Sequence, residues 1–267
     1  MDALRQIDGW PSPTAAVALA SAGGVVAAHG PQEQVFRWAS VTKLVTALAT
    51  LVAVEEGSVD LDQPAGPPGA TLRHLLAHAA GYSFEEATIL APPGQCRIYS
   101  NVGFEVAAAV VAEAAGMPFA DYLRAAVLEP LGLRAELQGS PAKGLCGSVA
   151  DLARLGRELL APTLVAPETL AEATTVAFPG LVGVLPLFGR QEPCDWGLGF
   201  ELRDGKAPHW TGSLNSPSTF GHFGGSGSFL WVDPVAQVAL ACLTDLDAGP
   251  WIREAWPALS DAVLAEL

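Results

Sequence analysis

The hydrophobic pattern changes its period along the chain, and the first change comes early. Residues Thr14–Ala28 are small and β-branched around the pair Gly23-Gly24, which predicts a hairpin of two strands. From Ser40 onward, apolar residues recur at helical spacing until the run ends at Gly57. A strand-forming start is therefore followed directly by an apolar helix.

The middle of the chain is predicted to be mostly helical. Loops rich in glycine and proline, such as Asp60–Gly69 and Gly116–Pro118, separate its apolar segments. One helix has a start resembling a capping box, Ser148–Asp151, and runs to Leu160. Three further helices are predicted, over Thr71–Ala79, Gly103–Ala115 and Ala120–Leu128.

The end of the chain returns to strands and closes with a helix. These elements are predicted over Gly197–Leu202, Ser228–Val232, Val238–Leu243 and Trp251–Leu267. Because strands lie at both ends and helices between them, the simplest packing is an antiparallel sheet built from both termini and flanked by helices. We therefore predict an α/β (α+β) fold. Residues 1–267 are expected to form a single domain, with a mostly helical lobe over about 60–190 inserted between the sheet-forming segments.

Composition narrows the possible partners. Half of the 267 residues are hydrophobic and 16% are charged, which excludes intrinsic disorder. Asp and Glu outnumber Lys and Arg by 28 to 14, and no run of cations exists, so we expect no nucleic-acid partner. The four cysteines form no CxxC pair, which argues against a zinc knuckle or redox motif and favours free thiols in a reducing compartment. They are Cys96, Cys146, Cys194 and Cys242.

The location of the protein is predicted from its apolar stretches. The segment Met1–Asp8 has no basic region followed by an apolar core, so we expect no secretory signal. The apolar run Leu44–Val54 is too short to cross a bilayer, and Pro179 and Pro186 interrupt the uncharged stretch Ala173–Gly189. We therefore expect a soluble, cytoplasmic protein without stable membrane insertion.

Candidate chemistry begins with Ser40-Val41-Thr42-Lys43. This spacing places a hydroxyl and an amine one helical turn apart on the same face. A serine needs a neighbouring base to become a nucleophile, and a desolvated lysine can serve because its pKa falls. The backbone N–H of Ser40 is free in the first turn to donate to an oxyanion. A second SxxK, Ser140–Lys143, contains a proline and has no helical periodicity, so we interpret it as a coincidence.

The tripeptide Tyr99-Ser100-Asn101 is a second candidate. Beside Lys43, Tyr99 could exist partly as phenolate, take the serine proton and return it to the leaving group. Asn101 could hydrogen-bond Lys43 or a substrate carbonyl. The alternative is structural: Tyr99 packs on the core and Asn101 caps the helix that begins near Gly103. The two roles of Asn101 are compatible.

A third candidate is His222-Phe223-Gly224, which leads into Gly225 and a predicted strand. Glycines there allow a strand edge to approach a ligand closely, and the Gly225 N–H is a candidate second oxyanion donor. His74 and His78 are spaced as a metal pair on a predicted helix. They lack the HExxH glutamate and an obvious third ligand, so we expect no metal and no cofactor.

In this order the three motifs resemble the SxxK, YxN and HxG set of the serine β-lactamase and penicillin-binding protein superfamily. They look most like its class C β-lactamase-related branch, which includes esterases, D-aminopeptidases and DD-carboxypeptidases. The resemblance extends from about residue 10 to the end of the chain, and it implies Ser40 as nucleophile, Lys43 and Tyr99 as proton-transfer groups and an acyl-enzyme intermediate. Other stretches agree with it: Phe36–Ala39, Leu75–Gly81, Trp196–Phe200 and Leu230–Pro234.

The third motif departs from the β-lactamases proper, which carry lysine where this chain has His222. A histidine with a reference pKa of about 6.5 is mostly uncharged at neutral pH, so it offers no fixed cation for a carboxylate. The net charge of -14 also disfavours anionic substrates at long range. We therefore expect hydrolysis of small uncharged esters or amides, with weak or no β-lactam turnover.

Three alternatives to this esterase-like hydrolase remain. The first is a DD-peptidase or D-aminopeptidase, the second a β-lactamase, and the third a non-catalytic scaffold that keeps the pocket. An α/β-hydrolase is excluded because no G-x-S-x-G surrounds Ser40. The stretch Ala173–Gly189 is predicted to be a mobile apolar flap over the acyl pocket, with a buried core connection as the alternative.

Overall fold

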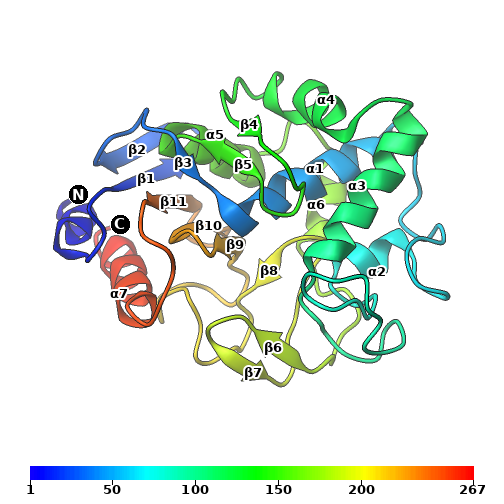
Figure 1. Cartoon of the computed structure of the whole chain (residues 1–267). Helices are drawn as coiled ribbons and strands as arrows, with labels where there is room; N and C mark the ends of the chain where they lie inside the picture. Colours follow the sequence, from blue (N-terminus) through cyan, green and yellow to red (C-terminus); the bar gives the residue numbers. More distant parts are fainter.

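In the computed structural model, which describes all residues from Met1 to Leu267, both ends of the chain enter one antiparallel sheet (Figure 1). Its strand order is β2-β1-β11-β10-β9-β8, so an N-terminal strand pairs directly with the last strand. The fold class predicted from the sequence is thereby confirmed. The strands are β1 (Ala15–Ser21), β2 (Gly24–His29), β8 (Glu201–Leu202), β9 (Phe220–Gly224), β10 (Ser228–Asp233) and β11 (Val238–Thr244).

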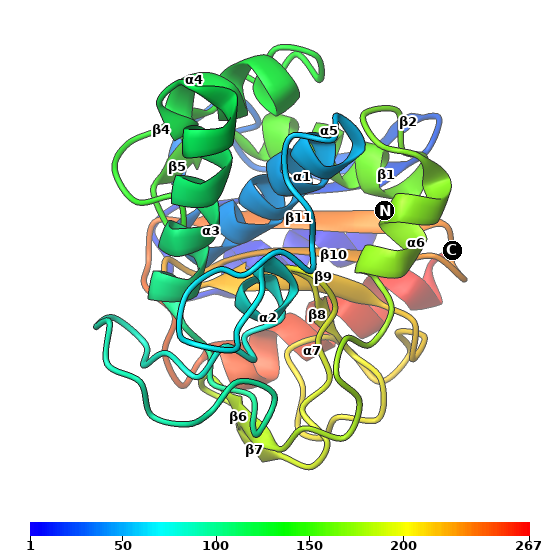
Figure 2. The same ribbon diagram turned by 90° about the vertical axis from the view of Figure 1, so that its right-hand side faces the viewer.

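The sheet is covered on both faces, because successive residues of a strand point to opposite sides. On β1, Ala16 and Ala18 belong to the larger core, whereas Val17 and Leu19 belong to the smaller one. Figure 2 shows α1 and α5 above the sheet and α7 below it. The covering elements are α1 (Thr42–Glu55) and α5 (Val149–Leu160) above, and η1 (Asp2–Gly9) and α7 (Ile252–Ala265) below.

The remaining helices gather beside α1, away from the sheet (Figure 1). They are α2 (Leu72–Leu76), α3 (Asn101–Ala115), α4 (Phe119–Leu123), the π turn η3 (Arg124–Leu128) and α6 (Pro167–Ala173). Two small sheets complete the fold: β3 (Phe36–Arg37) with β5 (Leu145–Gly147) and β4 (Glu136–Leu137), and the hairpin of β6 (Gly183–Leu185) and β7 (Gly189–Gln191). No single helix has the length and apolar composition needed to cross a membrane.

Helix starts show where local prediction holds and where it fails. The capping box at α5 is confirmed, since the Ser148 hydroxyl accepts from the Asp151 N–H and the Asp151 carboxylate accepts from the Ser148 N–H. The cap predicted at Asn101 is wrong. Ser100 holds that position, accepting from the Gly103 N–H at 3.2 Å, so α3 starts two residues earlier than predicted and Asn101 is free for other contacts.

Several other predicted elements change length. The helix predicted over Thr71–Ala79 ends at Leu76, and His78 adopts a left-handed conformation with φ of 55°. The strand predicted over Gly197–Leu202 shrinks to β8, and β9 was not predicted as a strand. The helical lobe over about 60–190 stays a prediction as a separate unit.

Candidate active site

Ser40 lies in a single 3₁₀ turn, η2 (Ala39–Val41), that leads directly into α1. Ala39, just before it, has a φ of 45°, in the left-handed region that alanine rarely adopts. Lys43 follows in the first turn of α1, fully buried, with its Nζ 3.3 Å from the Ser40 Oγ. The predicted pairing of hydroxyl and amine is therefore present in the fold.

The Nζ atom of Lys43 has three oxygen neighbours: Asn101 Oδ1 at 2.5 Å, the Ala142 carbonyl at 3.0 Å and Ser40 Oγ. The first two oxygens belong to carbonyl groups and can only accept hydrogen bonds. A neutral amine has two N–H groups, which these carbonyls can take up, and one lone pair, which then faces the serine. Burial lowers the pKa of Lys43 well below its usual value, and this favours the neutral amine. Such an amine can accept the serine proton.

The hydroxyl of Tyr99 lies 3.5 Å from Nε2 of His222. Nδ1 of His222 lies 2.6 Å from the Phe223 carbonyl, an acceptor, so Nδ1 carries the ring hydrogen and Tyr99 donates to Nε2. Burial is the largest cause that lowers the pKa of His222 to about 3, so this imidazole is neutral at pH 7. Burial also raises the pKa of Tyr99. The structure thus favours a neutral phenol over the phenolate expected from the sequence.

Two backbone donors, the N–H groups of Ser40 and Gly225, make no hydrogen bond within the protein. Both residues line one cavity of about 240 Å³. A Cβ on Gly224 would lie 2.5 Å from the Trp38 carbonyl oxygen, so this glycine allows the end of β9 to pack beside the Ser40 turn. Free N–H groups in a shared cavity can stabilise an oxyanion. The other lining residues are Phe84, Tyr99, Pro186, Leu187, Trp196, His222, Phe223 and Ala248.

Sequence reasoning missed the groups that orient Asn101. Its Nδ2 donates to Glu85 Oε1 at 2.9 Å, which turns Oδ1 toward Lys43. Glu85 in turn accepts from Lys143 at 2.8 Å, and the hydrogen bond from Lys143 lowers the pKa of Glu85. Lys143 belongs to the SxxK match interpreted as a coincidence. The turn that carries it also supplies the Ala142 carbonyl to Lys43, so this segment forms one wall of the lysine pocket.

Comparison with known proteins identifies the family. A family model described as Beta-lactamase matches this chain over residues 7–138 and 134–264. The chain belongs to the Beta-lactamase family. The resemblance seen in the three motifs is thereby confirmed, and with it a β-lactamase-like hydrolase.

Relatives within this family differ in what they are named for. The D-alanyl-D-alanine-carboxypeptidase/endopeptidase AmpH of Escherichia coli K12 is 27% identical over 139 residues, which cover 38% of this chain and 36% of that protein. Penicillin-binding protein 4* of Bacillus subtilis 168 is 27% identical over 131 residues, covering 37% and 29%. The match thus spans about a third of the length of these curated relatives.

Solved structures match over nearly the whole chain. A β-lactamase from Mycobacterium bovis is 54% identical, with a TM-score of 0.98, and the match covers 99% of this chain and 98% of that one. EstCE1, a hydrolase with promiscuous acyltransferase activity, has a TM-score of 0.81 at 20% identity, covering 98% and 96%. The second similarity shows the fold alone.

The charges around Lys43 in this Beta-lactamase family protein give a pH prediction. Glu85 raises the pKa of Lys43 and Lys143 lowers it. A general base works only unprotonated, so activity falls as the pH drops through its pKa. We expect Glu85→Gln to move the acidic limb of the pH profile of kcat/KM downward by roughly half a pH unit, and Lys143→Gln to move it upward by a similar amount. The measurement uses p-nitrophenyl butyrate at low salt.

Both variants in this pair keep a polar side chain, and glutamine at position 85 still offers an oxygen to Asn101. Because the two residues contact each other, a general loss of structure would affect both pH profiles in the same way. Shifts in opposite directions therefore show an effect of charge. A shift in the same direction in both variants, or none in either, would contradict the assignment of Lys43 as the base.

His78 positions the segment that carries Tyr99. Its Nδ1 accepts from the Ser100 N–H at 3.1 Å, and its ring centroid lies 4.5 Å from that of Tyr99. His74, the other member of the proposed metal pair, instead engages Thr71, with Nδ1 2.9 Å from the threonine Oγ1. The two rings therefore serve different partners, and no group of three or more His, Cys, Asp or Glu side chains is arranged to hold a metal ion.

The apolar stretch Ala173–Gly189 is partly buried and partly exposed beside the site, since Ala173, Leu185 and Phe188 belong to the hydrophobic cores. Pro186 and Leu187 line the cavity that contains Ser40. Val184 is 60% exposed and Leu187 is 41% exposed. The position over the pocket agrees with the predicted flap, whereas its mobility stays a prediction.

A buried polar cluster supports the wall of the site that carries Trp196. Glu201 accepts from Lys206 at 2.6 Å, from His209 at 2.9 Å and from Trp210 at 2.8 Å. Lys206 also donates to the carbonyl of Asp195, the residue before Trp196. Burial acts to raise the pKa of Glu201, but its interactions with His209 and Lys206 outweigh burial and hold that pKa at about 2.

Proposed function

We propose that this protein is a serine hydrolase that forms an acyl-enzyme at Ser40 and acts on small esters or amides that carry no charge beside the scissile bond. One observation carries the proposal. The buried Lys43 amine lies 3.3 Å from Ser40 Oγ, while the Asn101 and Ala142 carbonyl oxygens take up its two N–H groups. This arrangement supports general-base activation of the serine.

In the first half-reaction the Ser40 Oγ attacks the substrate carbonyl carbon and its proton passes to Lys43. The negative oxygen of the tetrahedral intermediate accepts from the N–H groups of Ser40 and Gly225. Tyr99, which lines the same cavity as Ser40 and donates to His222 Nε2 in the resting site, gives its proton to the departing alcohol or amine and regains one from Lys43. The products are the Ser40 ester and the released leaving group.

In the second half-reaction a water molecule takes the place of the leaving group. It loses a proton to the Lys43 and Tyr99 pair while its oxygen attacks the acyl carbon, and the same two backbone N–H groups stabilise the intermediate. The bond between the acyl carbon and Ser40 Oγ then breaks, and the proton returns to the serine. Lys43 and Tyr99 end the cycle neutral, as they began.

The expected substrate class follows from His222. Its buried neutral imidazole donates to the Phe223 carbonyl and accepts from Tyr99, so it presents no cation to a carboxylate at this point of the site. The cavity beside Ser40 is bounded mostly by apolar side chains, among them Phe84, Leu187 and Trp196. Both features support uncharged acyl compounds over penicillins and cephalosporins, which carry a carboxylate.

Peptidase activity is the second candidate, because of the partial match to the carboxypeptidase/endopeptidase AmpH. β-Lactamase activity is supported in turn by the similarity to the Mycobacterium bovis protein. A scaffold that binds without turnover is the candidate of a different class. Two experiments on the purified protein separate these four.

We expect a fluorophosphonate to add one label per chain, found on Ser40 by mass spectrometry and absent in Ser40→Ala. Ser140→Ala, which removes the serine of the other SxxK, serves as the matched control and keeps the label. A label on Ser140 or Ser100, or none at all, would overturn the proposal, the last result favouring the non-catalytic scaffold.

The same preparation decides the substrate class. We expect a larger kcat/KM for p-nitrophenyl butyrate than for a chromogenic cephalosporin or a D-amino acid amide. His222→Lys should shift the ratio toward the cephalosporin, because lysine adds a cation at the position that lacks one. A larger value for the cephalosporin or the amide in the unmodified protein would replace the esterase assignment with that activity.

A further inference from the structure

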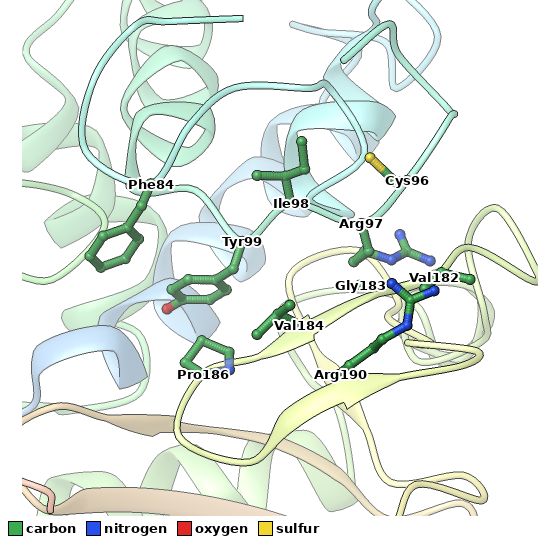
Figure 3. A pocket seen from close by; sticks show the side chains of 10 residues that line it. All are labelled: Phe84, Cys96, Arg97, Ile98, Tyr99, Val182, Gly183, Val184, Pro186 and Arg190. Carbon is green, nitrogen blue, oxygen red and sulfur yellow. The ribbon is translucent and has the colours of Figure 1, made fainter. Parts of the chain in front are cut away.

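A second and larger cavity, of about 550 Å³, adjoins the one that contains Ser40. Phe84, Tyr99 and Pro186 line both cavities, so the two meet at the Tyr99 side chain. Figure 3 shows Tyr99 at one end of the larger cavity and two arginines at the other. Its remaining lining residues are Cys96, Arg97, Ile98, Val182, Gly183, Val184 and Arg190.

The larger cavity combines apolar walls with positive charge. Ile98, Val182 and Val184 supply the apolar part, and no acidic side chain lines it. Arg97 is 3% exposed and donates to backbone carbonyls, with no carboxylate in an ion pair with it. Burial lowers the pKa of Arg97 to about 10, so it keeps its charge at neutral pH. In a chain with a net charge of -14, this cavity is a local site of positive charge.

Arg190 is the cation that a bound molecule can reach. It extends from β7 toward Arg97 and the β6 strand (Figure 3). Its contact with Glu192 is long, 3.5 Å between nitrogen and oxygen, and both side chains are about two-thirds exposed, at 68% and 67%. A pair so exposed is worth little, so its guanidinium is available to another carboxylate, which it can hold with two hydrogen bonds.

We propose that the second cavity binds the leaving group of the substrate, and that this group is an apolar chain ending in a carboxylate held by Arg190. The assignment of this cavity to the leaving group, and not to the acyl group, rests on the proposed function. Tyr99 hands the proton to the leaving group, so that group lies on the Tyr99 side of the scissile bond, where the second cavity begins. The remote carboxylate lies away from His222, so the uncharged surroundings of the scissile bond are unaffected.

The reaction that follows is ester hydrolysis with a charged product. The bond between the acyl carbon and the alcohol oxygen breaks as Ser40 Oγ bonds to the acyl carbon. The alcohol oxygen takes a proton from Tyr99 and leaves as an ω-hydroxycarboxylate. Water then releases the acyl group as a carboxylic acid, so no oxidant, reductant or further reactant is needed.

The test uses a pair of esters that differ only in charge, ω-acetoxyoctanoate and ω-acetoxyoctanamide, with acetate release as the measurement. We expect kcat/KM for the carboxylate to exceed that for the amide by about threefold to fivefold, the range of a partly exposed ion pair, and mainly through KM. Arg190→Gln should reduce the ratio to about one. High salt should reduce it as well, because it screens exposed charges.

Arg134→Gln is the matched control, because Arg134 has the same 3.5 Å contact with a carboxylate, that of Glu33, and a similar exposure of 77%. It should leave the ratio unchanged, and it should hydrolyse p-nitrophenyl acetate as the unmodified protein does. If the protein hydrolyses p-nitrophenyl acetate but has equal kcat/KM values for ω-acetoxyoctanoate and ω-acetoxyoctanamide, the second-cavity proposal alone is overturned. Failure to hydrolyse p-nitrophenyl acetate at all would instead count against the proposed function. If Arg134→Gln reduced the ratio of the two kcat/KM values as much as Arg190→Gln does, the role assigned to Arg190 would also be overturned.

Discussion

Replacing Lys43 by alanine is expected to lower kcat for p-nitrophenyl butyrate by about three orders of magnitude or more, and Tyr99→Phe by a similar factor. The double variant should lose little more than either single one. The reason is that both side chains serve one proton path, from Ser40 to the amine and onward to the leaving group, so either change interrupts it. Single-turnover kinetics on all three variants measure the coupling.

Tyr99→Phe is the cleaner of the two changes. It removes one hydroxyl, whereas loss of Lys43 also leaves the buried oxygens of Asn101 and Ala142 without their donor and lowers stability. Thermal unfolding of each variant therefore accompanies the kinetics. Turnover of Tyr99→Phe near that of the unmodified protein would show that the tyrosine is structural and that Lys43 works alone.

The second large effect is on stability. We expect Lys206→Met to lower the free energy of unfolding by about 3–5 kcal/mol, because it leaves the fully buried Glu201 carboxylate without its ammonium partner. Lys206 and Glu201 are 1% and 0% exposed, so solvent cannot replace the lost contact. Urea unfolding at pH 7 is the measurement.

Lys143→Met is the matched control for this change. It removes the same type of side chain from a carboxylate contact of similar length, 2.8 Å, but both partners are nearly half exposed. Lys143→Met should lower the free energy of unfolding by less than about 1 kcal/mol. Equal costs for the two lysines would show that the Glu201 cluster adds nothing beyond a surface pair. Acid should also lower the free energy of unfolding. Because the pKa of Glu201 is about 2 in the folded state, its stabilisation is present at neutral pH and declines as the pH falls toward that value.

The elements predicted well from the sequence are those with long and regular patterns. The helical period of α1 and the cap of α5 at Ser148 needed only local information. β9 (Phe220–Gly224) escaped prediction because it is short, contains two glycines and is buried at every position, so it has no alternation of polar and apolar residues. The helix over Thr71–Ala79 was predicted too long because His78 leaves the helix and accepts a hydrogen bond from Ser100, a residue 22 positions later in the sequence.

The same distinction applies to the site. Ser40 and Lys43 are three residues apart in one turn, so their spacing alone predicted their contact. Glu85 had no such signal, because it reaches Asn101 only through the fold of an exposed loop. The Ala142 carbonyl had none either, since every residue carries a carbonyl and only the backbone path decides where it points.

The pairing of β1 with β11 has a kinetic consequence. Ala15 pairs with Thr244, so the middle of the sheet joins the two ends of the chain. Closing so large a loop is entropically costly, and contacts of this kind slow folding. During synthesis β1 emerges well before β11 and has no partner on that side until the chain as far as Thr244 has followed. Its apolar residues and those of α1 must wait exposed over that time, which makes the incomplete chain prone to aggregate and a natural client for chaperones.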